Sequence, residues 1–182
     1  RPETIVLGLG MPSLVANHGG AALSVSDVGG VNVAGIIVEA GANESPTLLE
    51  VGEPGSAADH FANPTSLHDL FCRVGGGQPG TAQSCVTINS HDVIGDHFWL
   101  WRADHGSGAE GARPGWDNLR SANGLIVNGD DVTVYGLFVE HFQEYQTLWN
   151  GNGGRLYFYQ SEIPYDPPDD TIWSPDGGVT KG

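Results

Sequence analysis

The feature that most restricts the fold of this chain is a 22-residue repeat near its carboxyl end. An Asn-Gly pair occurs at 128–129 and again at 150–151, and the strand-like run after each pair ends on a glutamate, Glu140 or Glu162. A constant offset between matching residues is typical of a solenoid, in which each period forms one coil. The repeat therefore predicts a parallel β-helix in which the two glutamates stack on one face, about 4.8 Å apart.

Weaker copies of the pattern lie earlier in the chain. Residues 31–39 align with 132–140 and share valines, a glycine and the final glutamate. Residues 86–93 align with 125–132, and that match places Trp101 at the position that the glutamates occupy in the other coils. We therefore expect one ladder along a sheet face and an asparagine stack at a turn. The ladder comprises Glu39, Trp101, Glu140 and Glu162, and the stack comprises Asn128 and Asn150.

Composition favours many short strands, because 28 glycines and 11 prolines separate runs rich in valine, isoleucine, leucine and phenylalanine. Residues 56–70 could instead form one short helix or a loop. A jelly roll or sandwich is the alternative all-β fold, but it would not require a constant offset. The expected strands are Thr4–Leu9, Ala22–Ser26, Val31–Glu39, Thr47–Val51, Leu70–Val74, Cys85–Asn89, Val93–Trp101, Leu125–Asn128, Val132–His141, Thr147–Asn150 and Leu156–Glu162.

Strand alternation predicts which side chains face the interior. Val132, Val134 and Phe138 should point inward. Within 98–101, either the phenylalanine and leucine or the two tryptophans face in, so we expect at least one exposed tryptophan.

The length suits one domain, with residues 1–164 as the β-helix with loop excursions and 165–182 as an irregular loop or linker. The chain opens abruptly into a strand, as a mature or trimmed chain would. Both ends of an isolated β-helix need a cap, and no capping pattern is visible. We therefore expect part of a longer solenoid, or pairing with another chain at the ends.

The net charge of −15, with Lys181 as the only lysine, argues against nucleic-acid and anionic-membrane partners. The chain has no apolar run long enough for a transmembrane helix. A neutral polysaccharide is compatible with this charge. Cys72 and Cys85 flank a glycine-rich stretch, and we favour a disulfide over two buried thiols. A disulfide implies an oxidising compartment, so we expect a secreted, extracellular protein.

Two stacked carboxylates cannot both ionise easily, so one of them should hold a proton near neutral pH. Tyr159 and Tyr165 would desolvate Glu162 and raise its pKa, which suits a proton donor. Backbone hydrogen bonds to that carboxylate would lower the pKa instead. A protonated acid beside a second carboxylate is what acid-catalysed glycosidic cleavage requires.

Other side chains near these glutamates are candidates for sugar contacts. Trp99 or Trp101 could offer a flat face, with Asp104 and His105 bonding hydroxyls, although those two could simply close a turn. The other candidates are His141, Tyr145 and Gln146. His91, Asp92, His97, Asp104 and His105 could assemble a metal site, but no zinc-ligand spacing is present. We therefore expect no metal and no cofactor.

Three stretches resemble the glycoside hydrolase family 55 β-1,3-glucanases (laminarinases) in their order and in the glutamate spacing. They lie at 98–105, at 135–141 with Tyr145 and Gln146, and at Gln160-Ser-Glu-Ile-Pro-Tyr165. The resemblance covers roughly residues 4–168. It implies a right-handed parallel β-helix, a pectate-lyase-like solenoid, that hydrolyses β-1,3-glucan with inversion, typically from a chain end. It places the proton donor on Glu162 and gives Glu140 a part in organising the attacking water or the sugar.

The resemblance also implies a missing partner. Enzymes of this family consist of two β-helical halves that face a shared cleft, and this chain resembles one of them. Inverting hydrolysis needs carboxyl groups about 6.5–9.5 Å apart, so Glu140 fits an assisting role better than that of sole base. Trp101, Tyr145 and Tyr165 are the candidate sugar platforms, and Gln160 lies beside the proposed acid.

Two other functions remain open at the level of sequence. A non-catalytic carbohydrate-binding or structural β-helix would suit a chain that resembles only one half. A polysaccharide lyase on the same scaffold would usually need an arginine or lysine base near calcium and a uronate substrate. Six arginines and a strong negative charge suit that chemistry poorly.

Overall fold

The computed structural model describes residues 1–105 and 115–168 of the chain, which contain twelve β-strands. In these two stretches there is no helix with the length and apolar character needed to cross a membrane. The strands are β1 (Ile5–Leu7), β2 (Ser13–Ala16), β3 (Leu23–Val25), β4 (Asn32–Ala40), β5 (Ser45–Val51), β6 (Ser66–Val74), β7 (Ala82–Ile88), β8 (Ile94–Arg102), β9 (Ser121–Val127), β10 (Thr133–Glu140), β11 (Tyr145–Trp149) and β12 (Arg155–Glu162).

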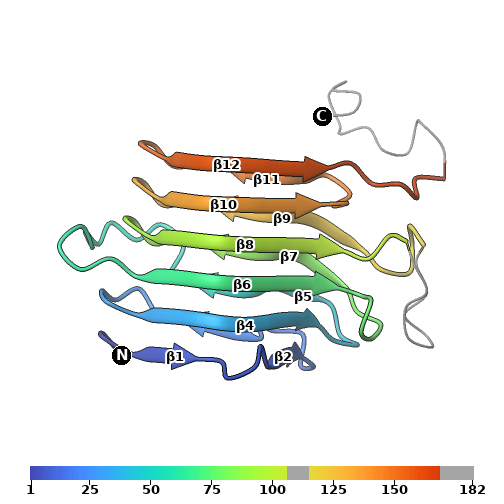
Figure 1. The fold of residues 1–182 in the computed structure, drawn as a ribbon, viewed down its shortest axis with the longest axis horizontal. Coiled ribbons are helices and arrows are strands. Elements are labelled where there is room, and N and C mark those ends of the chain that lie inside the picture. The colour runs from blue at the N-terminus through green and yellow to red at the C-terminus, as the bar shows by residue number, and fades with distance from the viewer. Residues whose placement is uncertain (106–114, 169–182) are drawn as a thin grey trace.

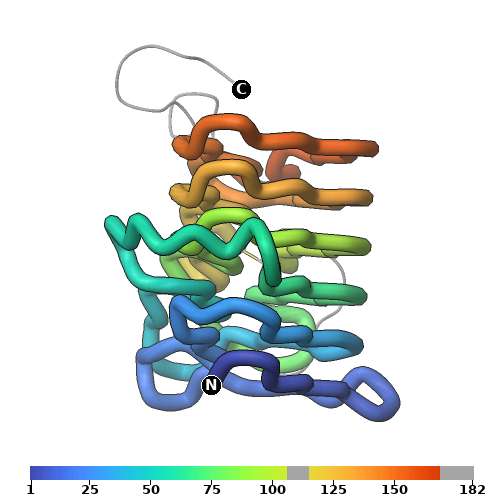
Figure 2. The backbone as a smooth tube through the Cα atoms, turned by 90° about the vertical axis from the view of Figure 1, so that its left-hand side faces the viewer, coloured from blue at the N-terminus to red at the C-terminus, as the bar shows by residue number. Residues whose placement is uncertain are grey.

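The strands form two sheets that lie one behind the other (Figure 1). Sheet A has the order β1-β4-β6-β8-β10-β12, with β2 also paired to β4, and sheet B has the order β11-β9-β7-β5-β3. Every strand pair is parallel. From β2 onward, successive strands alternate between the sheets, so the chain winds in stacked coils (Figure 2). The all-β solenoid is therefore confirmed, and the sandwich alternative, which needs antiparallel pairs, is wrong.

The strand register confirms the predicted ladder and adds one member. Glu140 pairs with Glu162 on one side and with Trp101 on the other. Arg73 lies between Trp101 and Glu39 in the same column. Its Nη2 donates to Glu39 Oε1 at 2.6 Å. Loops at 52–65 and 75–81 lengthen the earlier coils, so the 22-residue spacing holds only for the last coil. Because of these loops, the sequence alignment did not reveal Arg73 as a member of the ladder.

Strands β4, β6, β8, β10 and β12 of sheet A switch their inward face part-way along, because one residue in each adopts a left-handed backbone. These residues are Gly35, Asp69, His97, Gly136 and Phe158, with φ between 49° and 72°. They lie between matching register pairs, so they form a column across the sheet. A residue in this conformation bends a strand and reverses the alternation of its side chains.

This switch corrects one prediction. Val132 and Val134 are buried as expected, but Leu137 and Val139 follow them into the core. Phe138 is only half-buried and faces outward, so its predicted inward position was wrong. In β8 the same switch turns Phe98 and Leu100 inward and leaves Trp99 48% exposed, which confirms the expected exposed tryptophan.

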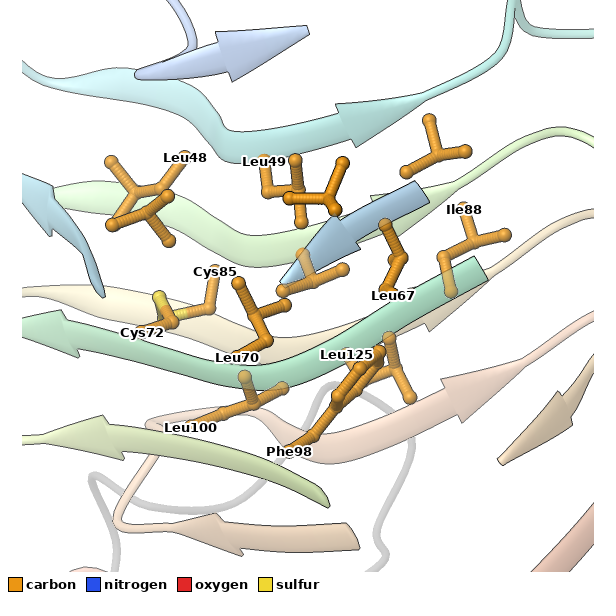
Figure 3. Close-up of a cluster of buried hydrophobic side chains, with 14 of the residues drawn as sticks. Leu48, Leu49, Leu67, Leu70, Cys72, Cys85, Ile88, Phe98, Leu100 and Leu125 are labelled. Atoms are coloured by element: carbon orange, nitrogen blue, oxygen red, sulfur yellow. A yellow bond between two sulfur atoms is a disulfide. The ribbon is translucent and has the colours of Figure 1, made fainter. Parts of the chain in front are cut away.

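The core fills the space between the two sheets with leucine, isoleucine and valine (Figure 3). Cys72 of β6 and Cys85 of β7 form a disulfide within it, which confirms the predicted bond. The bond joins sheet A to sheet B, and both cysteines are fully buried. The two sheets are therefore linked covalently through the interior as well as by their loops.

The asparagine stack is confirmed and is longer than predicted. Asn150 Nδ2 donates to Asn128 Oδ1 at 2.8 Å, and Asn128 Nδ2 donates to Asn89 Oδ1 at the same distance. Residues 56–65 contain no helix; they belong to the loop that leaves the coil between β5 and β6 (Figure 2). Strand β6 begins at Ser66, earlier than expected, and β2 was not foreseen.

Candidate functional site

The candidate residues gather where β8, β10 and β12 end. Glu140 is the last residue of β10 and Glu162 is the last residue of β12. Asp104 and His105 follow β8, and His141 follows β10. Parallel strands all end at the same edge of a sheet, so the three coils deliver these side chains to one corner of the molecule.

Hydrogen bonds hold Glu162 on two sides. Its Oε1 accepts from Gln160 Nε2 at 3.0 Å, and its Oε2 accepts a short hydrogen bond from the Tyr165 hydroxyl. His141 Nε2 lies 3.8 Å from the same Oε2. The carboxylate is thus surrounded by donors, while its side chain remains 38% exposed.

This environment sets the charge of Glu162. The hydrogen bond from Tyr165 holds the pKa of this carboxyl below its usual value; partial burial opposes the shift, and the positive charge of a protonated His141 adds to it. The same bond raises the pKa of the Tyr165 phenol. The predicted increase in the pKa of Glu162 was therefore wrong, because Tyr165 acts on the carboxylate as a donor and not as an apolar neighbour.

Glu140 leans away from Glu162 toward an aromatic groove. Its Oε2 accepts a hydrogen bond from Trp99 Nε1 at 3.1 Å. The groove has a volume of about 350 Å³, and its lining includes His97, Trp99, Phe138 and Glu140. Phe71 stacks on Trp99 with ring centroids 4.8 Å apart. The outer face of sheet A therefore offers a stack of flat rings beside a carboxylate.

Asp104 and His141 lie beneath this surface, with side chains 0% and 1% exposed. Asp104 Oδ2 accepts from the Tyr165 backbone N at 2.6 Å, and Oδ1 lies 2.5 Å from His105 Nδ1. His141 Nδ1 lies 3.1 Å from the Ile163 carbonyl oxygen and 3.3 Å from Asp104 Oδ2. Neither buried side chain presents surface for the sugar contact expected of it, whereas His105 and Tyr165 are exposed above them.

The atoms of Asp104, His105 and His141 that could ligate a metal all lie within 4.8 Å of one another, close enough to surround an ion. Their hydrogen bonds to each other and to the Tyr165 backbone already account for this arrangement. His91 and His97 do not join them. His91 Nδ1 accepts from the Asp130 backbone N, and His97 lies on the outer face of sheet A.

The remaining candidates occupy different positions around the corner. Trp101 contacts His105 edge to face at 6.3 Å between ring centroids. Gln146 Oε1 accepts from the Phe142 backbone N, and Gln146 Nε2 donates to the Phe142 carbonyl oxygen, so this side chain fixes the turn into β11. Tyr145 is exposed at the start of β11, in sheet B.

Sequence reasoning missed a buried ion pair behind the site. Arg102, fully buried, donates through Nη1 and Nη2 to the two carboxylate oxygens of Asp166 at 2.9 and 2.6 Å. It also donates to the carbonyls of Leu119 and His141. A signal was present: Arg102 follows Phe98 and Leu100 at the inward positions of β8, where a charge needs a partner.

Comparisons with known proteins give a consistent result. A family model described as the LAM55 pectate lyase-like domain matches residues 1–162. An exo-beta-1,3-glucanase from Streptomyces sp. (strain SirexAA-E / ActE) is 50% identical over 169 residues, which cover 93% of this chain and 27% of that protein.

Two solved structures are also similar. Both are of sacteLam55A from Streptomyces sp. SirexAA-E, and one is a variant in complex with glucose. Each superposes with a TM-score of 0.90, at 47% identity for the glucose complex and 48% for the other. Each match covers 97% of this chain but 31% of the solved chain. The chain thus spans less than a third of the length of the relatives it matches.

Proposed function

This chain belongs to the LAM55 pectate lyase-like domain family, and from that premise we propose that it is the part of a β-1,3-glucan hydrolase that carries the proton donor. The membership agrees with the resemblance to glycoside hydrolase family 55 seen in the sequence. The relative that is 50% identical is named an exo-beta-1,3-glucanase. The proposed substrate is therefore a laminarin-like β-1,3-glucan.

The single observation that carries the proposal is the register pair Glu140–Glu162 at the end of an exposed aromatic groove. Flat rings pack against the C–H faces of sugars, and carboxylates accept hydrogen bonds from sugar hydroxyls. We assign general acid catalysis to Glu162. Glu140 supports it, since its carboxylate lies between Trp99 and the acid.

The acid role requires the pKa of Glu162 to rise when substrate binds. In the free site the Tyr165 hydroxyl and the surrounding water both favour the ionised form. A sugar over the site removes water from a side chain that is now 38% exposed, and its hydroxyls compete for Tyr165. Both effects favour the protonated carboxyl, which can then donate to the glycosidic oxygen.

We further infer a right-handed coil that forms one of two β-helical halves, with the second half facing this site. The close superposition on under a third of a solved chain supports this arrangement. The second half would supply the base that activates water at the distance that inversion requires. A secreted location is supported by the buried disulfide, because such bonds persist in oxidising compartments.

The test is Glu162→Gln in the full-length protein, with laminarin as substrate and reducing sugar as the readout. Gln keeps the size of the side chain but cannot act as an acid, so turnover should be abolished while the melting temperature stays unchanged. Glu144→Gln is the matched control, because Glu144 is exposed and lies outside the groove. Near-normal turnover by Glu162→Gln would remove the assignment.

The same assays separate the alternatives. Laminarin binding by the wild-type protein without product would favour a non-catalytic binding module. Ultraviolet absorbance from unsaturated uronates would favour a lyase.

A further inference from the structure

A buried histidine lies directly behind the exposed carboxylate of Glu162. The His141 side chain is 1% exposed, so it cannot touch a sugar, yet its Nε2 lies 3.8 Å from Glu162 Oε2. A histidine in that position has one of two roles. It either fills space in the core, or it acts on the carboxylate.

The surroundings of Nδ1 show how the ring is held. This atom faces two acceptors, the Ile163 carbonyl at 3.1 Å and Asp104 Oδ2 at 3.3 Å. Two acceptors require a donor between them, so Nδ1 carries the hydrogen. Nε2 is then the ring atom presented to Glu162. A distance of 3.8 Å is too long for a hydrogen bond, so the imidazole acts on the carboxylate through space, by its charge when the ring is protonated.

Asp104 also holds a second neighbour of Glu162. Its Oδ2 accepts from the backbone N of Tyr165, the residue whose hydroxyl donates to Glu162. One buried carboxylate therefore orients both partners of Glu162, the imidazole from below and the phenol from the side.

We propose that Asp104 and His141 form a buried positioning pair for Glu162, in which Asp104 orients the imidazole and the charge on the imidazole sets how readily Glu162 takes up a proton. This inference rests on the proposed acid role of Glu162. Neither residue touches substrate. Protonated His141 favours the ionised Glu162, whereas neutral His141 leaves the carboxyl free to hold its proton.

Other charged groups also face the imidazole. His105 and Tyr165 pack against it, with ring centroids 5.1 and 4.7 Å away. Glu140 precedes it in the chain, and Arg102, paired with Asp166, donates to its carbonyl oxygen. All of these groups are still present when His141 is replaced, so a substitution there tests the contribution of the ring.

The experiment is His141→Asn in the full-length protein. The Asn amide lies where Nδ1 was and can still donate to the Ile163 carbonyl, but the Nε2 side and its charge are lost. The pKa of Glu162 should then rise. We expect the basic limb of the kcat/KM profile on laminarin, which reports the free protein, to move up on the order of one pH unit. This is the size expected for a unit charge about 4 Å away when water screens most of the interaction, and the Glu162 side chain is 38% exposed.

Two further variants keep the result interpretable. His141→Gln also removes the charge while placing its amide near Nε2, and it should shift the limb in the same direction. His18→Gln, at an exposed histidine, should leave the profile unchanged. The midpoint of a profile does not depend on the fraction of folded protein. Lower activity with an unshifted midpoint in both His141 variants would therefore mean that the ring is only structural, and the proposal would fail.

A second readout does not depend on turnover. Glutamate labelled with ¹³C at the carboxyl reports the titration of Glu162 directly, its signal being assigned as the one missing in Glu162→Gln. The pKa of Glu162 should be higher in His141→Asn than in the wild type. If the wild type has no activity on laminarin but this shift is present, the proposed function fails and the positioning pair stands. If the wild type is active on laminarin but the shift is absent, the positioning pair fails and the proposed function stands.

Discussion

Replacing Asp166 with alanine should release the segment that holds Tyr165 over the site. Asp166 accepts both Nη donors of Arg102, whose side chain is fully buried. The variant leaves that guanidinium without its counter-charge. Breaking a buried pair from one side costs about 3–5 kcal/mol.

The structure sets the expected value near the lower end of that range. Arg102 keeps its bonds to the carbonyls of Leu119 and His141, at 2.7 and 3.0 Å. Its guanidinium also remains stacked over the Trp116 ring, with Arg102 Cζ 5.3 Å from the ring centroid. Asp166 itself is 13% exposed, so water can reach part of the space it leaves. We therefore expect a loss of about 3 kcal/mol.

The loss should appear first as local opening, because residues 163–168 follow the last strand and contain none of their own. The measurement is native-state hydrogen exchange at the Tyr165 amide, which donates to the buried Asp104. Exchange should accelerate on the order of 100-fold, the factor that corresponds to about 3 kcal/mol. Asp117→Ala, at an exposed residue, is the control. If the Tyr165 amide exchanged at the wild-type rate in Asp166→Ala, the buried pair would not be what holds this segment.

Three further predictions follow from the site and the core. Replacing both Cys72 and Cys85 with alanine should cost about 3 kcal/mol in urea denaturation, as the chain-entropy estimate gives for residues 13 apart; an unchanged midpoint would contradict this. Tyr165→Phe removes the largest cause of the lowered pKa of Glu162, so the basic limb of kcat/KM should move to higher pH even as kcat falls. Glu140→Gln should lower kcat on laminarin yet retain turnover that Glu162→Gln lacks, and complete loss would make it a second essential group.

The sequence predicted the register at the site because the last coil has no insertion. Only short turns and β11 separate β10 from β12, so residues 22 apart become spatial neighbours, and Glu140 and Glu162 pair as expected. Arg73 escaped detection because earlier loops vary in length. The position of Phe138 was predicted wrongly because the left-handed residue Gly136 reverses the alternation of side chains along β10. A glycine in the sequence does not reveal whether its backbone is left-handed.

The charge of Glu162 was harder to predict than its position. A nearby tyrosine can desolvate a carboxylate or donate to it, with opposite effects on the pKa. The direction of the Tyr165 hydroxyl depends on the turn after β12. That turn is fixed by Asp104 and Arg102, more than 60 residues earlier in the chain. Sequence periodicity carries no information about such contacts, and only the folded coil brings them together.

Glu140 and Glu162 end neighbouring strands of the same sheet, so they do not suit the acid and the base of the proposed inverting hydrolysis. Neighbouring strands lie about 4.8 Å apart, whereas an inverting acid and base need about 6.5–9.5 Å so that a water molecule fits between them. Hydrogen bonds draw the two side chains apart along the sheet, since Trp99 binds Glu140 while Tyr165 and Gln160 hold Glu162, but both carboxylates stay on the same face of sheet A. Water attacks the face of the sugar opposite the acid, so its activating group must approach from across the groove. In the proposed function, the described face of sheet A supplies the acid and the aromatic surface, and we expect the base to come from a structure that faces it.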